Sequence, residues 1–131
     1  MARHRRVGFL VGLAVLAAGL FSTATEAKPL PGYQCMMLNI TEQQSMDPTF
    51  HVSVRAQPSA SAQVVGTAGS VVIVRVPAKP VNGYLEMLFP DGRAVWIAAD
   101  AVRPYHSLGD PNAKCEPETL SNERIGFGSQ R

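Results

Sequence analysis

The feature that most constrains this chain is a run of short apolar stretches with a period of two, separated by turn residues, over residues 50–103. Phe50, Val52 and Val54 alternate with more polar side chains, as in a strand with one buried face. Similar short apolar stretches follow at residues 64–65, 71–76, 84–89 and 94–97. Because no stretch beyond the N-terminal segment has a helical period, the sequence predicts a small all-β barrel or sandwich of about five short strands.

The alternation also assigns side chains to faces, and the loops between the stretches have turn chemistry. Val72, Val74 and Val76 share one face of their predicted strand. In residues 84–89, two sets of side chains lie on opposite faces, which are Leu85, Met87 and Phe89 on one and Tyr84, Glu86 and Leu88 on the other. Loops rich in Gly, Pro and Asn occupy residues 77–83 and 90–92, and Asn-Gly is a strong turn dipeptide.

The N-terminus has the three-part order of a secretory signal. Residues 1–6 are cationic, residues 7–21 carry no polar side chain, and residues 22–27 are mostly small. Fifteen apolar residues are fewer than the about 20 that a helix needs to cross a bilayer. Cleavage after Ala24 or after Ala27 fits a small-residue rule, and an uncleaved anchor is the alternative. We expect an exported protein, periplasmic or secreted, without stable membrane insertion after cleavage.

Length and charge limit the function classes. The chain has 131 residues, which leaves room for one small domain plus extensions and excludes a two-domain enzyme. Its 12 Lys and Arg and 10 Asp and Glu give a net charge of +2. Removing residues 1–27 takes away three arginines and Glu26, so nine of each sign are left and the net charge is zero. A chain with no net charge lacks the excess of positive charge that is typical of proteins that bind nucleic acid.

Export changes how the two cysteines, Cys35 and Cys115, are interpreted. In an oxidising compartment an even pair predicts an intramolecular disulfide, with intermolecular pairing and free thiols as the alternatives. Such a bond would close a loop of about 80 residues, for which the chain-entropy model gives roughly 4–5 kcal/mol of stabilisation. The chain has no Cys-x-x-Cys motif, so a thiol oxidoreductase is not favoured.

Three groups of residues resemble the bacterial SH3 (SH3b) family in order and spacing. The first is Val52-Ser-Val-Arg55-Ala-Gln-Pro58-Ser59, and the second is Val64-Val65-Gly66 with a loop that holds Gly69. The third comprises Asn82-Gly83-Tyr84-x-x-Met87, Asp91-Gly92-Arg93 and Trp96-Ile97. Val95 stands where the family usually has Gly, and Tyr84 stands where it usually has Trp. The resemblance covers residues 51–103.

The resemblance implies an SH3-like barrel over residues 50–104, preceded by a signal peptide at residues 1–27. Residues 28–49 then form an N-terminal arm and residues 105–131 a C-terminal tail, and both are expected to be irregular. Gly, Asn, Ser and charged residues dominate residues 121–131, which predicts that the end of the tail is disordered. A disulfide would tie both arms to the barrel.

Four residues are candidates for a ligand surface: Tyr84, Trp96, Arg55 and Phe89. Tyr84 and Trp96 adjoin loops that could rim one face of the barrel, and aromatic side chains combine apolar contact area with a polar handle. The alternative for the two aromatic residues is that they fill the edge of the barrel. For Arg55 the family match favours a hydrogen bond that holds a loop in place.

The sequence assigns no catalytic, cofactor-binding or metal-binding residue. It lacks Gly-x-Ser-x-Gly, His-Glu-x-x-His and the phosphate-binding loop motif. Cys35 with His51 or His106 is the only conceivable Cys/His pair, and a disulfide would use up the thiol. Soft ligands for copper are present but without ordered spacing, namely Met36, Met37, Met46, Cys35 and His51.

These observations predict an exported binding module that is not an enzyme and needs no cofactor. The resemblance implies partners in the cell envelope, either peptidoglycan (a cell-wall peptide or glycan) or an envelope protein. The alternative is a structural or inhibitory envelope protein that caps a partner protein and has no wall ligand. The sequence assigns no oligomeric state.

The N-terminal pattern makes a first prediction. The exported protein is expected to lack the first 24 or 27 residues, because the charged, apolar and small segments follow the order that signal peptidases recognise. Intact-mass measurement of the exported protein checks this. A form that keeps residues 1–21 and stays in the membrane fraction would contradict it.

Overall fold

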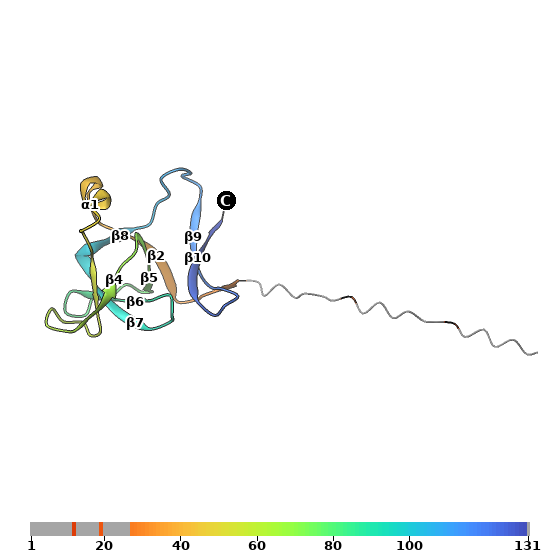
Figure 1. Ribbon diagram of the computed structural model, residues 1–131, viewed down its shortest axis with the longest axis horizontal. Helices are drawn as coiled ribbons and strands as arrows, with labels where there is room; N and C mark the ends of the chain where they lie inside the picture. Colours follow the sequence, from red (N-terminus) through yellow and green to blue (C-terminus); the bar gives the residue numbers. More distant parts are fainter. Residues whose placement is uncertain (1–11, 13–18, 20–26, 131) are drawn as a thin grey trace, which may run out of the picture.

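The computed structural model describes residues 12, 19 and 27–130. The predicted signal peptide lies almost entirely outside these residues, so export and its cleavage position stay predictions. Figure 1 shows the described chain as an assembly of strands with one short helix.

Ten strands, one helix and one 3-10 turn make up the described part of the chain. The first five strands are β1 (Lys28–Pro29), β2 (Tyr33–Leu38), β3 (Ser53–Arg55), β4 (Val64–Thr67) and β5 (Val71–Arg75). The last five are β6 (Tyr84–Leu88), β7 (Ala94–Ala98), β8 (Val102–Pro104), β9 (Lys114–Thr119) and β10 (Ile125–Gln130). The helix is α1 (Glu42–Met46), which a capping box at Thr41 begins, and the 3-10 turn is η1 (Ala99–Ala101).

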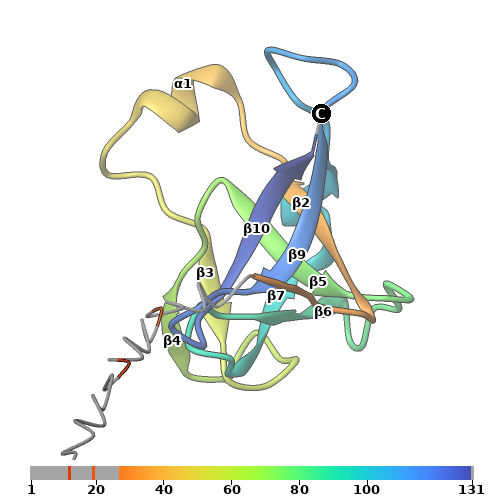
Figure 2. The same ribbon diagram turned by 90° about the vertical axis from the view of Figure 1, so that its right-hand side faces the viewer.

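The strands form two antiparallel sheets, which confirms the all-β prediction. A seven-stranded sheet has the order β4-β3-β7-β6-β5-β2-β8, and a three-stranded sheet has the order β1-β9-β10. In the larger sheet β4 and β8 are the two ends and do not pair with each other, so the sheet is not a closed barrel. Figure 2 shows β9 and β10 lying across β2 and β5.

The seven-stranded sheet curls around a single core. Six of its strands contribute buried apolar side chains to one cluster, which comprises Leu38, Val54, Val72, Val74, Leu85, Met87, Val95, Ile97 and Val102. The predicted inner face of β6 is therefore confirmed, and so are two of the three valines predicted to share a face in β5. The third, Val76, is 45% exposed, because β5 ends at Arg75 and the chain turns away from the core there.

The prediction of an irregular N-terminal arm over residues 28–49 is wrong. Strand β2 pairs with β5 on one side and with β8 on the other, and its Leu38 belongs to the core. Met36 and Leu38 face the core, whereas Cys35 is buried on the opposite face. Because both faces of β2 are covered, its sequence lacks the apolar–polar alternation by which a half-buried strand is recognised.

The prediction of a disordered end of the chain is also wrong. Residues from Ile125 to Gln130 pair with β9 over the whole length of β10. The glycines that suggested disorder lie under side chains of the other arm of the hairpin. A Cβ atom at Gly126 would lie 2.9 Å from Leu120 Cδ1, and one at Gly128 would lie 2.9 Å from a carboxylate oxygen of Glu118.

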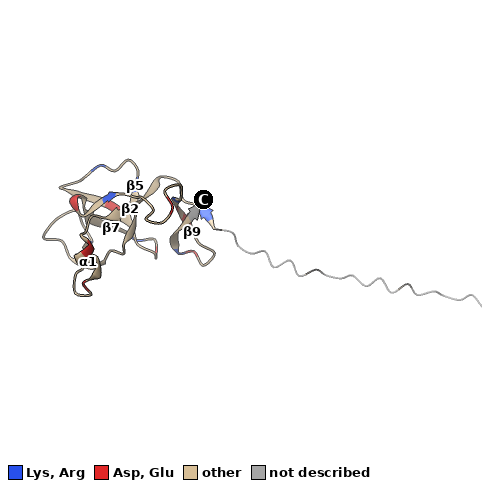
Figure 3. Ribbon diagram, turned by 90° about the horizontal axis from the view of Figure 1, so that it is seen from above, with Lys and Arg blue, Asp and Glu red and all other residues tan. Residues whose placement is uncertain are grey.

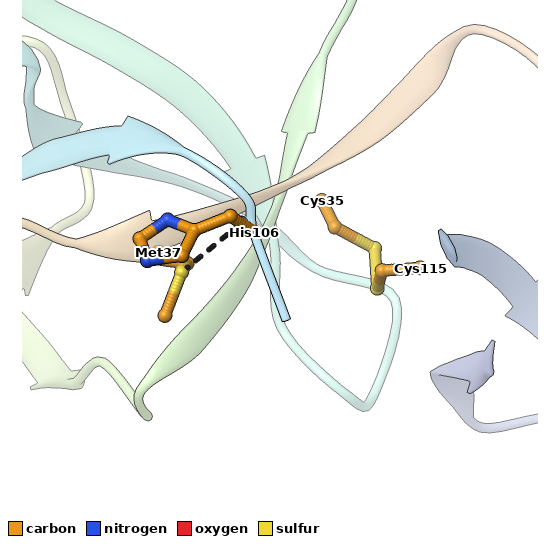
Figure 4. The surroundings of a disulfide bond; sticks show 4 residues. All are labelled: Cys35, Met37, His106 and Cys115. Carbon is orange, nitrogen blue, oxygen red and sulfur yellow. Dashed lines mark hydrogen bonds between the residues drawn. A yellow bond between two sulfur atoms is a disulfide. The ribbon is translucent and has the colours of Figure 1, made fainter. Parts of the chain in front are cut away.

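The disulfide between Cys35 and Cys115 is present, as predicted. Its Cα atoms are 6.0 Å apart, and it joins β2 of the large sheet to β9, the middle strand of the small one. Figure 4 shows this bond between the two ribbons. The disulfide is therefore a covalent link between the two sheets.

The core makes a second prediction, for which β3 and β4 offer a matched pair. Val54 is 0% exposed and Val64 is 48% exposed, and both lie on paired strands. We expect Val54→Ala to lower the free energy of unfolding by about 1.5–3 kcal/mol, because it removes buried apolar surface and leaves a cavity. Val64→Ala should cost less than about 1 kcal/mol. Urea unfolding of both variants measures this, and equal losses would contradict the assignment of the core.

Candidate functional site

Three of the four predicted surface residues lie together on the outer face of the large sheet. Arg55 in β3 and Glu86 in β6 are both register partners of Trp96 in β7. Tyr84 pairs with Ala98, two residues from Trp96, so the two aromatic residues are diagonal neighbours within reach of each other. Directly opposed residues share a face, and the neighbouring residues of β6 and β7 point into the core. We call Arg55, Tyr84, Glu86 and Trp96 the outer aromatic face.

The rings of Tyr84 and Trp96 are partly open to solvent. Both residues are half-buried, whereas Leu85 and Ile97, their neighbours along β6 and β7, are 4% and 0% exposed. The core of the sheet is thus complete without the two aromatic side chains. This arrangement offers apolar contact area together with a hydroxyl and an indole N–H for a ligand.

Arg55 has a structural contact of its own. Its guanidinium Nη1 donates a hydrogen bond to the carbonyl oxygen of Ala62 at 2.8 Å. The backbone N–H of Ala56 donates to the carbonyl oxygen of Gln63 at 2.9 Å, which closes the same loop. Arg55 therefore holds the loop over residues 56–63, as the alternative interpretation of the sequence predicts, while its stem lines the outer aromatic face.

Glu86 supplies the negative charge on this face. Its Oε1 lies 3.4 Å from Nη1 of Arg75 in the neighbouring strand β5, and its side chain is 24% exposed. At that distance and exposure the pair contributes little to stability, and it directs the carboxylate toward β5, on the side of β6 away from Trp96. Figure 3 shows basic and acidic positions dispersed along the ribbon.

Phe89, the fourth predicted surface residue, does not belong to the outer aromatic face. It follows Leu85 and Met87 in the alternation and packs against the core. A Cβ atom added at Gly66 would lie 2.7 Å from its ring, and the guanidinium of Arg93 lies 5.3 Å from the ring centroid. In the same turn, hydrogen bonds from the backbone and side chain of Arg93 lower the pKa of the Asp91 carboxyl. Phe89 and its turn thus cover one end of the core.

A cavity of about 690 Å³ lies beside the disulfide. Its lining comes from both ends of the described chain and includes Tyr33, Tyr105, the two cysteines and four prolines, Pro29, Pro31, Pro104 and Pro117. No local sequence pattern predicts this cavity, because its residues meet only when β9 packs on β2. The two cysteines were the one signal that these segments lie together.

The described residues give no support for a metal centre. Within residues 27–130, no three His, Cys, Asp or Glu side chains are grouped so that they could hold a metal ion. The sulfur of Met37 accepts a hydrogen bond from the backbone N–H of His106 at 3.3 Å (Figure 4), and Cys35 is part of the disulfide.

None of the helices in the described part of the chain is long and apolar enough to cross a membrane.

Comparisons with protein-family models, with curated proteins and with solved structures give no match to this chain. The outer aromatic face is therefore interpreted from its own chemistry.

The contacts of Arg55 make a third prediction, with Arg75 as the matched control. We expect Arg55→Met to lower the free energy of unfolding by about 1–2 kcal/mol and to speed amide exchange in residues 56–63, since a charged donor is lost from a loop carbonyl. Arg75→Met removes only an exposed ion pair at 3.4 Å and should cost less than about 0.5 kcal/mol. Hydrogen exchange and urea unfolding measure both. Unchanged exchange in the loop of the Arg55 variant would contradict this role.

Proposed function

We propose that this chain is an exported, non-enzymatic binding module of the SH3b type whose outer aromatic face recognises a cell-wall peptide or glycan. The observation that carries the proposal is the placement of Tyr84 and Trp96 as diagonal neighbours on the solvent-facing side of β6 and β7. Half-exposed aromatic side chains that the core does not use are anchors suited to sugars and peptides.

Two further observations support the assignment to the SH3b family and a location outside the cytoplasm. The residues that resemble the SH3b family lie mainly in β3, β4, β6 and β7 and the turns around them, within the larger of the two sheets. The Cys35–Cys115 disulfide is compatible with a protein that works outside the cytoplasm, where such bonds persist.

The chemistry of the face indicates how a ligand binds. The rings of Tyr84 and Trp96 stack against a sugar ring or an extended peptide, and the carboxylate of Glu86 accepts hydrogen bonds from hydroxyl or ammonium groups. Nη1 of Arg55 already donates to Ala62, so Arg55 contributes mainly its stem. With a mature net charge of zero, long-range steering is weak, and binding should depend little on salt.

A second candidate function is the capping of an envelope protein, without a wall ligand. Its support is the exposure of Leu108, at 86%, next to a cavity of about 410 Å³ whose lining includes Met37, Ile40 and Arg103. This surface lies near α1 and β8, away from the outer aromatic face.

The fourth prediction separates the two functions. We expect Trp96→Ala to abolish retention of the mature protein on purified peptidoglycan while the variant still folds, since the ring is half-buried and outside the core. Trp96→Phe should keep part of the retention, because it preserves an aromatic face. Pulldown on peptidoglycan and on envelope extract in parallel, with circular dichroism as the folding control, measures this.

Leu108→Ala is the matched surface control for that experiment. Under the wall-binding proposal it leaves retention on peptidoglycan unchanged. If Trp96→Ala unfolds the protein, the indole is structural and the aromatic face is not the site. If Trp96→Ala binds as before and Leu108→Ala alone loses an envelope protein, the capping function replaces the wall-binding one.

A further inference from the structure

The two sheets differ in how they are held together. Every residue of the buried core cluster, and every half-buried residue packed against it, lies between Met36 and Val102. The large sheet therefore has a complete core without any side chain from β9 or β10. The three-stranded sheet has no comparable cluster, and in the described part of its strands the buried residue is Pro117.

The three-stranded sheet instead covers a second apolar surface on the outer side of β2, β5 and β6. Cys35 and Ile73 are register partners, are 7% and 5% exposed, and lie outside the core cluster. Leu88 is the partner of Ile73 on the next strand. A pocket of about 180 Å³ is lined by Ile73 and Leu88 of the large sheet and by Ile125 and Phe127 of β10, and Phe127 is 50% exposed. The contact between β10 and the large sheet is thus incomplete at this pocket.

A backbone hydrogen bond and a disulfide join the small sheet to the large one. The backbone N–H of Ile125 donates to the carbonyl oxygen of Pro90 at 2.8 Å, at the start of β10. The ion pairs Arg75–Glu86 and Arg93–Asp91 lie within the large sheet and its turn. The disulfide between β2 and β9 is the covalent link.

The bond is also within reach of a reductant. The cavity of about 690 Å³ is lined by both cysteines. Cys35 is buried, whereas Cys115 is half-buried, so Cys115 is the more accessible of the two residues to a thiolate.

We propose that the Cys35–Cys115 disulfide is a redox latch, and that a dithiol reductant opens it through Cys115 and so releases the three-stranded sheet from a large sheet that stays folded. A thiolate of the reductant attacks Sγ of Cys115 and forms a mixed disulfide, and Cys35 leaves as a thiolate that takes up a proton. The second thiol of the reductant then displaces Cys115. The reductant ends as a disulfide and the protein as two thiols. Release uncovers Ile73 and Leu88, and leaves the outer aromatic face in place.

Hydrogen–deuterium exchange of the full mature chain, oxidised and with dithiothreitol, tests the latch. In the reduced protein, amides of β9 and β10 should exchange within about tenfold of the unstructured rate. Amides of β3 and β5–β7 should stay protected by at least about a hundredfold more. A double variant, Cys35→Ser with Cys115→Ser, should match the reduced protein and should not respond to dithiothreitol.

Two exchange results would overturn the proposal. Loss of protection in all strands together, in the reduced protein or in the double variant, would mean that the large sheet depends on the bond. Retained protection of β9 and β10 after reduction would mean that packing alone holds the small sheet. The direction of attack is tested by trapping with a monothiol at limiting concentration, which should label Cys115 at least about tenfold more than Cys35. Preferential labelling of Cys35 would overturn that step.

Discussion

The position of β2 between β5 and β8 is the constraint on which the rest of the structure depends. One face of this strand places Leu38 and Met36 against the core, and the other presents Cys35 to β9. Without β2 the large sheet would end at β5, and β8 would have no partner. The same six residues therefore complete the core of one sheet and anchor the other.

The outer aromatic face follows from that core. Once Leu85, Met87, Val95 and Ile97 point inward, the period of two sends Tyr84, Glu86 and Trp96 outward. Pairing of β3 with β7 then brings Arg55 to the same surface. The packing of the core thus decides which side chains a ligand can contact. The outward position of Tyr84 and Trp96 follows from the inward position of their neighbours.

The proposed ligand surface and the disulfide lie in different parts of the molecule, because the large sheet has its own core and the small sheet is joined to it through the disulfide. The proposed ligand surface lies on β6 and β7, whereas the disulfide lies between β2 and β9. Opening the disulfide exposes Ile73, whereas the core residues on the inner face of β6 and β7 stay packed. A change of redox state can therefore alter one surface of the molecule without removing the other.

The sequence by itself determined the half-buried strands β3 and β6, because an alternation of side chains between two faces reports one buried face directly. It also predicted the partners in the disulfide, since only two cysteines are present, and that Tyr84 and Leu85 lie on opposite faces of their strand. Only the tertiary structure decided that β2 belongs to the large sheet, because a strand covered on both faces shows no alternation. It alone decided that Gly126 and Gly128 lie in a strand, because pairing with the neighbouring strand β9 orders a segment whose composition suggests disorder. The place of β2 depends on β5 and β8, which are distant from it in the sequence, so no local pattern reports it.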